Sequence, residues 1–204
     1  MGAGVIFLDR QHAGRPGRRG QDRGAAADFD GSGVIEHDER EANLTPVYLR
    51  AAELRLLEYG HTVIPVSDGS YRERAARINA YASEYPPGTP MCAIAAHINA
   101  GLGSYGICFH DHRSRTGPEL AARIAHELRQ IAPELSDVRI LSCGPSDWTR
   151  NAYACIKWIG SPIAICFEPF FIDNPAHSGL TQPHGLQAIG HALADGINRW
   201  TASR

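Results

Sequence analysis

The sequence lacks several features that would place the chain in other classes of protein. No apolar run approaches the roughly 20 residues that a membrane-spanning helix needs, so we expect no membrane insertion. There is no excess of positive charge, because the formal net charge is -2. Proteins that bind nucleic acid usually carry a basic excess, and we therefore expect no nucleic-acid partner.

Two further absences concern the compartment and the chemistry of the thiols. The N-terminus enters a strand-like pattern at once, without the charged region and apolar stretch of a signal peptide. The sequence has five cysteines, which is an odd number, and no CxxC pair. We therefore expect a protein that is made in the cytoplasm, with reduced, mostly buried thiols and no disulfide framework. We also expect it to be a monomer.

Alternating strand-like and helix-like patterns indicate the fold class. A chain of 204 residues that is 43% hydrophobic fits one globular domain, spanning residues 1–204, with a full core. The alternation predicts an α/β fold, with a mostly parallel twisted sheet of about six strands and helices on both faces. The expected strands are 4–8, 61–66, 91–97, 105–110, 138–141 and 162–168, and the expected helices are 40–59, 70–83, 117–131 and 186–200, with a less clear short helix within 147–158.

Three of the expected strands lead into side chains that bind metals or move protons. His12 follows the first strand, His97 ends the third, and Glu168 ends the last. Ligands of open α/β sheets bind at the carboxyl ends of the strands, and a neutral imidazole is a natural metal ligand. A single histidine in such a place is more often structural, but the joint arrangement predicts that these ends converge on one zinc ion.

A catalytic zinc site needs about three protein ligands, so a carboxylate is expected beside the two histidines. Glu36, Glu39 and Glu41 lie near the start of the first expected helix and are all candidates. The helix dipole favours carboxylates at that position anyway. Glu168 stands beside Phe167, and apolar surroundings raise the proton affinity of a carboxylate. That suits a general base and acid, although a glutamate at a strand end can also simply cap a turn.

Five segments together resemble one enzyme family, the zinc-dependent N-acetylmuramoyl-L-alanine amidases of the amidase-3 type, over nearly the whole chain. The segments are Val5–Asp9 with His12-Ala13-Gly14, Glu41 with the helix that ends in Leu56–Gly60, RAARIN at 74–79, His97-Ile98-Asn99-Ala100, and Pro162–Asn174. One departure is the Arg10-Gln11 pair, which stands where the family usually has proline and glycine.

The resemblance implies a fold, a reaction and a set of site residues. His12, Glu41 and His97 would bind zinc, with Glu39 and Glu36 as competitors for the carboxylate, and Glu168 would be catalytic. The substrate would be peptidoglycan, cut at the amide between N-acetylmuramic acid and L-alanine. Without a signal peptide, the chain would be the catalytic domain of an endolysin that reaches the cell wall through a holin-type pore.

Two residues outside this set are candidates for contacts with the substrate. Asn99 follows His97 closely, and His177 lies in a loop rich in proline and glycine beyond Glu168. For His177, a solvated position in the loop is the commoner arrangement.

Residues 28–39 have the spacing of an EF-hand calcium loop. Hard oxygen ligands at this spacing wrap a hard cation, and Gly33 falls at the sharp turn. The expected calcium ligands are Asp28, Asp30, Ser32, Val34, Glu36 and Glu39. The glycine-rich segment before the loop does not favour the helix that normally precedes it, so a hydrogen-bonded turn is the alternative. If calcium takes Glu39, Glu41 becomes the stronger candidate for zinc.

Other functions remain open at the level of the sequence. The chain could be another zinc amidohydrolase or peptidase, or a non-catalytic, calcium-regulated module that binds the cell wall. A hydrolase with a cysteine nucleophile, Cys92 or Cys143, is a rival interpretation, and it is disfavoured because Cys92 lies in an apolar run without an activating charge nearby.

Overall fold

A computed structural model of the chain describes residues 2–12, 16–17, 20–28, 32–36, 40–145 and 149–204. Its main sheet has six strands in the order β4-β1-β5-β8-β6-β7. The strands are β1 (Val5–Arg10), β4 (Thr62–Val66), β5 (Met91–Ala96), β6 (Gly106–Asp111), β7 (Val138–Cys143) and β8 (Ile163–Glu168), and a separate pair is β2 (Pro16–Gly17) with β3 (Gly20–Gln21). The α-helices are α1 (Glu41–Glu58), α2 (Tyr71–Ala82), α3 (Gly117–Ile131), α4 (Arg150–Ile156) and α5 (Pro183–Thr201), and the short 3₁₀ helices are η2 (Pro133–Leu135) and η3 (Pro175–Thr181).

The sheet is mostly parallel, as the sequence predicts. β1 pairs in parallel with β4 and β5, β5 pairs in parallel with β8, and β6 pairs in parallel with β7. The junction between β6 and β8 is antiparallel. Because β1, β5 and β8 are parallel neighbours, their carboxyl ends lie side by side at one edge of the sheet.

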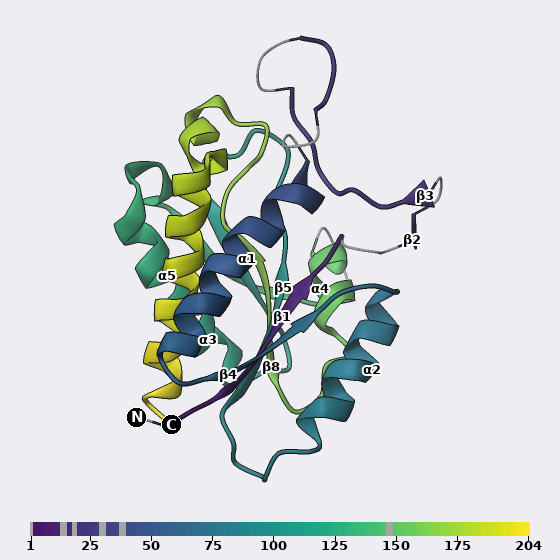
Figure 1. Cartoon of the computed structure of the whole chain (residues 1–204), viewed down its shortest axis with the longest axis vertical. Helices are drawn as coiled ribbons and strands as arrows, with labels where there is room; N and C mark the ends of the chain where they lie inside the picture. The colour runs from purple at the N-terminus through teal and green to yellow at the C-terminus, as the bar shows by residue number, and fades with distance from the viewer. Residues whose placement is uncertain (1, 13–15, 18–19, 29–31, 37–39, 146–148) are drawn as a thin grey trace.

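Helices cover both faces of this sheet (Figure 1). In β1, Ile6 and Leu8 belong to the core cluster shared with α1, α3 and α5. Val5 and Phe7, which point to the other face, belong to the cluster shared with α2 and α4. Burial on both faces explains why the central strands read as nearly continuous apolar runs. The predicted α/β architecture with two helical layers is confirmed.

Helix α1 ends where the sequence places a glycine. Gly60 has φ +82°, a conformation that glycine adopts without strain. The N–H of His61 donates to the carbonyl of Leu56, and the N–H of Gly60 donates to that of Leu57. This pair of bonds is a Schellman motif, which turns the chain sharply into β4.

Other boundaries differ modestly from those expected. The closing helix begins at Pro183, since proline fits the first turn of a helix. The long loop contains the pair β2 and β3, whose strands of two residues each are too short to leave a periodic pattern. All five cysteines are free and buried, as predicted. No helix within the described ranges combines the length and the apolar character of a membrane span.

His61 should make the stability of the fold depend on pH. Its Nδ1 accepts a hydrogen bond from the N–H of Gly4, and its Nε2 lies 3.1 Å from Oδ1 of Asn198. Nδ1 must therefore be unprotonated, and burial lowers the pKa of His61 below its usual value, against the opposing bond to Asn198. The unfolded chain then binds more protons than the native one below about pH 6.5.

We expect the free energy of unfolding to fall as the pH decreases below that value. Urea unfolding at a series of pH values measures the effect, with His61→Asn as the variant and the exposed His126→Asn as the matched control. An equal pH dependence in wild type and His61→Asn would contradict this role.

Candidate metal centre and active site

His12, Glu41 and His97 come together at the carboxyl edge of the sheet. Nε2 of His12 lies 3.0 Å from Oε1 of Glu41 and 3.2 Å from Nδ1 of His97. Nδ1 of His97 lies 2.9 Å from the same oxygen of Glu41. A tetrahedral zinc ion with bonds of about 2.0–2.1 Å separates its ligand atoms by about 3.3 Å. The triangle therefore has the donor types and the size that fit a small tetrahedral cation.

Glu41 is a buried carboxylate held in its ionised form. It is the first residue of α1, and its side chain is 4% exposed. Oε1 accepts the N–H of Ile98 at 2.9 Å, and Oε2 accepts the N–H of Ala25 at 2.7 Å. Burial acts to raise the pKa of Glu41, but the hydrogen bonds from the two histidines outweigh it and hold this pKa well below its usual range.

The structure separates the three candidate carboxylates. Glu41 faces both histidines, Glu36 is exposed, and Glu39 lies outside the described residues.

Asp22 orients the first histidine. Its Oδ1 lies 3.1 Å from Nδ1 of His12, so the opposite ring nitrogen, Nε2, is directed toward Glu41. Carboxylates in this outer position fix the tautomer and the direction of metal-binding histidines. The sequence analysis missed Asp22 because it lies in the long loop, where no periodic pattern indicates its direction.

Removing this carboxylate should weaken metal binding without abolishing it. We expect Asp22→Ala to lower the affinity for zinc by about 10–100-fold, because the His12 ring would lose its orienting partner. Competition with a chromophoric chelator measures the affinity. The matched control is Asp137→Ala, which removes an exposed carboxylate that is far from Asp22 in the sequence. An unchanged zinc affinity in Asp22→Ala would contradict the orienting role of Asp22.

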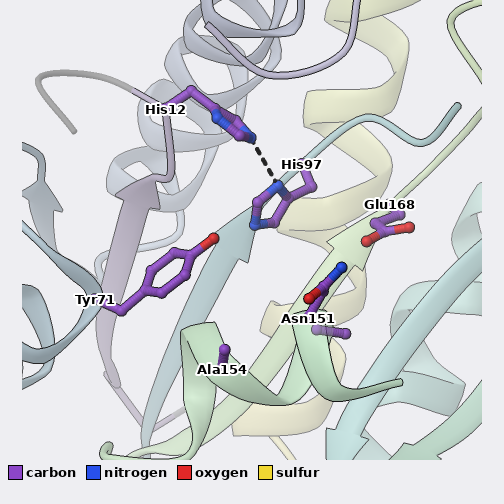
Figure 2. Close-up of a pocket in the computed structure, with 7 residues that line it drawn as sticks. His12, Tyr71, His97, Asn151, Ala154 and Glu168 are labelled. Atoms are coloured by element: carbon purple, nitrogen blue, oxygen red, sulfur yellow. Dashed lines mark hydrogen bonds between the residues drawn. The ribbon is translucent and has the colours of Figure 1, made fainter. Parts of the chain in front are cut away.

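Glu168 lies in the same pocket as the two histidines. The pocket has a volume of about 350 Å³ and is lined by His12, Tyr71, His97, Asn151, Ala152, Ala154 and Glu168. Figure 2 shows His97 between His12 and Glu168. Burial raises the pKa of Glu168 to about 7, the Glu41 carboxylate adds to the rise, and His97 opposes it. A carboxyl group with this pKa can both accept and return a proton near neutral pH.

Two helices supply pocket residues that the sequence analysis did not identify. Tyr71 is the first residue of α2, and Asn151, Ala152 and Ala154 lie on α4. The expected short helix within 147–158 is present as α4, but it is the packing of α4 against α2, β6 and β8 that brings it to the site. No motif or spacing in 150–156 indicates this position.

The predicted contacts of Asn99 and His177 with substrate fall outside this pocket. His177 is 1% exposed, and its Nδ1 accepts the N–H of Phe171. The expectation of a solvated or cleft-lining histidine is therefore corrected, because the ring packs inside the protein. Asn99 pairs through its backbone with Phe170 and Ile172, and its Oδ1 accepts the N–H of Ala100.

The expected calcium loop is described in part. Both oxygens of Asp28 accept backbone N–H groups, from Ser32 and from Gly33, and the hydroxyl of Ser32 lies 3.1 Å from the carbonyl of Val34. This is the hydrogen-bonded turn that the sequence left as the alternative. Residues 22–28 form no helix before the loop. Asp30 and Glu39 lie outside the described residues, and calcium binding stays a prediction.

Comparisons with known proteins identify the fold. No protein-family model matches the chain, and no curated protein matches its sequence. Among solved structures, Cwp6 from Clostridium difficile superposes with a TM-score of 0.71 at 19% identity over 97% of this chain, which spans 29% of the Cwp6 chain.

Two other solved structures align over nearly their full length. The N-acetylmuramoyl-L-alanine amidase AmiC2 of Nostoc punctiforme has a TM-score of 0.70 at 15% identity, over 100% of both chains. The catalytic domain of the CD27L endolysin, which targets Clostridia difficile, has a TM-score of 0.65 at 16% identity, over 95% of this chain and 96% of that one. The chain therefore has the fold of N-acetylmuramoyl-L-alanine amidases, including an endolysin catalytic domain.

Proposed function

We propose that the chain is a zinc-dependent N-acetylmuramoyl-L-alanine amidase, which hydrolyses the amide between N-acetylmuramic acid and L-alanine in peptidoglycan. The observation that carries the proposal is the triangle of His12, Glu41 and His97, with Glu168 in the same pocket. The fold shared with amidases that bear this name supports it. The proposal includes degradation of the cell wall by an endolysin-like, monomeric domain that reaches the wall through a holin-type pore.

The residues of the site suggest how the amide would be cut. Zinc held by His12, Glu41 and His97 would supply a Lewis acid that polarises a carbonyl and acidifies a water. Glu168 accepts a proton from the attacking water and passes it to the nitrogen of L-alanine as the C–N bond breaks. The products are a carboxylate on the sugar's lactyl group and a free amine on the peptide, so water is added across the amide.

Elemental analysis and a digestion assay test this proposal together. We expect about one zinc per chain in the purified wild type and none in His97→Ala, because the variant removes one of three ligands. Digestion of purified peptidoglycan should release new N-terminal L-alanine only with the zinc-loaded protein. His126→Ala is the matched control, since the side chain of His126 is 63% exposed.

The outcomes also separate the alternatives. A protein without zinc that still sediments with cell walls would contradict the amidase and favour the wall-binding module. Zinc with cleavage of a different amide would favour another amidohydrolase or peptidase.

A further inference from the structure

A second group of metal-binding side chains shares His97 with the first. Cys155 of α4 and Cys166 of β8 are 2% and 0% exposed. Their sulfur atoms and a ring nitrogen of His97 all lie within 4.8 Å of one another. We call these three residues the thiol cluster. No part of the proposed hydrolysis uses its two cysteines.

The contacts of the two thiols differ from those of ordinary buried cysteines, which behave as small apolar side chains. Cys155 donates to the carbonyl of Ala152 at 2.9 Å, and its sulfur lies within 4.8 Å of the sulfur of Cys166 and of a ring nitrogen of His97. Cys166 lies 3.8 Å from Oε1 of Glu168. Cys108, by contrast, is a fully buried thiol within the core cluster on the other face of the sheet. The thiol cluster is thus a chain of polar contacts that joins His97 to Glu168.

The two ring nitrogens of His97 allow it to belong to both groups. Nδ1 faces Glu41 and His12, so Nε2 is the nitrogen left for the thiol cluster. Two thiolates and an imidazole are soft or borderline ligands, which select ions such as Cd²⁺, Zn²⁺ or Cu⁺ over Mg²⁺ or Ca²⁺. Helix α4, which carries Cys155, also forms a wall of the pocket through Asn151, Ala152 and Ala154, so the thiol cluster lies next to the pocket that holds His97 and Glu168.

We propose that His97, Cys155 and Cys166 form a second metal site, which binds a thiophilic cation through two sulfurs and one nitrogen. Binding releases the protons of the two thiols to solvent and forms two metal–sulfur bonds and one bond to Nε2 of His97, while the ring proton stays on Nδ1, so the ring serves one of the two sites at a time. An ion at this place would occupy His97 and stand beside Glu168, so thiophilic metals should inhibit any reaction in the pocket.

Titration of the purified full chain with Cd²⁺ tests the proposal, because thiolate-to-cadmium charge transfer absorbs in the ultraviolet only when sulfur binds the ion. We expect the absorption to saturate at one equivalent in wild type and to be lost in both Cys155→Ala and Cys166→Ala. Cys108→Ala is the matched control and should keep it. His12→Ala should also keep it, since that variant removes a ligand of the first site alone.

Crystals of the wild type soaked in Cd²⁺ give a second measurement that depends on no variant. An anomalous peak bonded to both sulfurs and to Nε2 of His97 is the expected result. Full absorption in either cysteine variant, no absorption in wild type, or a peak only between His12 and Glu41 would each overturn the proposal. Because these readouts do not involve turnover, they are independent of whether the chain cuts peptidoglycan.

Discussion

Glu168→Gln should keep the metal at its wild-type stoichiometry and lower kcat by about 10²–10⁴-fold, the usual contribution of a general acid–base group. Glutamine has nearly the same shape as glutamate but cannot take up and return the proton. The position supports this role, because Glu168 ends β8 and lines the pocket with both histidines. Its pKa of about 7, raised mainly by burial, places the proton exchange near neutral pH.

Release of N-terminal L-alanine from peptidoglycan, followed over time, measures kcat for this variant, and elemental analysis measures the metal. The exposed Glu84→Gln is the matched control and should retain full activity. Near-normal turnover in Glu168→Gln would remove Glu168 from the mechanism. Loss of metal together with turnover would instead make Glu168 part of the metal site.

Arg74→Met should lower the free energy of unfolding by about 3–5 kcal/mol, the cost of leaving a buried charge without its partner. The guanidinium of Arg74 lies 2.7 Å from Oδ1 of Asp9, and the two side chains are 1% and 3% exposed. Burial already raises the pKa of Asp9 against the pull of Arg74. Without Arg74, that carboxyl group must be protonated or remain buried as an uncompensated charge.

Urea unfolding measures this effect, with Arg72→Met as the matched control on the exposed side of the same helix. The double variant Asp9→Asn with Arg74→Met should recover part of the loss, because it removes both charges. A loss in Arg74→Met as small as that in Arg72→Met would show that the ion pair contributes little.

The same ion pair contacts both residues that stand between Asp9 and the first histidine. Arg74 also donates to the carbonyls of Gly69 and Arg10, and the side-chain amide of Gln11 donates to Asp9. Gln11 is fully buried. The Arg10-Gln11 pair, which departs from the proline and glycine of the resembled family, is therefore built into the contacts that hold the end of β1 two residues before His12.

The local pattern of the sequence predicted the fold class and which strands lead into the site residues. The spacing of apolar residues along the chain is a local property of the sequence. A strand that is covered on both faces must be apolar along its length, and a helix needs start and stop residues such as Gly60. The sequence therefore predicted the six-stranded, mostly parallel sheet and placed His12, His97 and Glu168 after buried runs. Neighbouring parallel strands then bring these ends to one edge.

Contacts between segments far apart in the chain were decided only by the tertiary structure. Residue spacing left Glu36, Glu39 and Glu41 open, and it was the packing of α1 against β1 and β4 that brought Glu41 to His97. Packing likewise buried His177, brought Asp22 to His12, and placed α4 with Cys155 beside Cys166. Each of these contacts depends on how whole elements lie against one another, which no local pattern of residues determines.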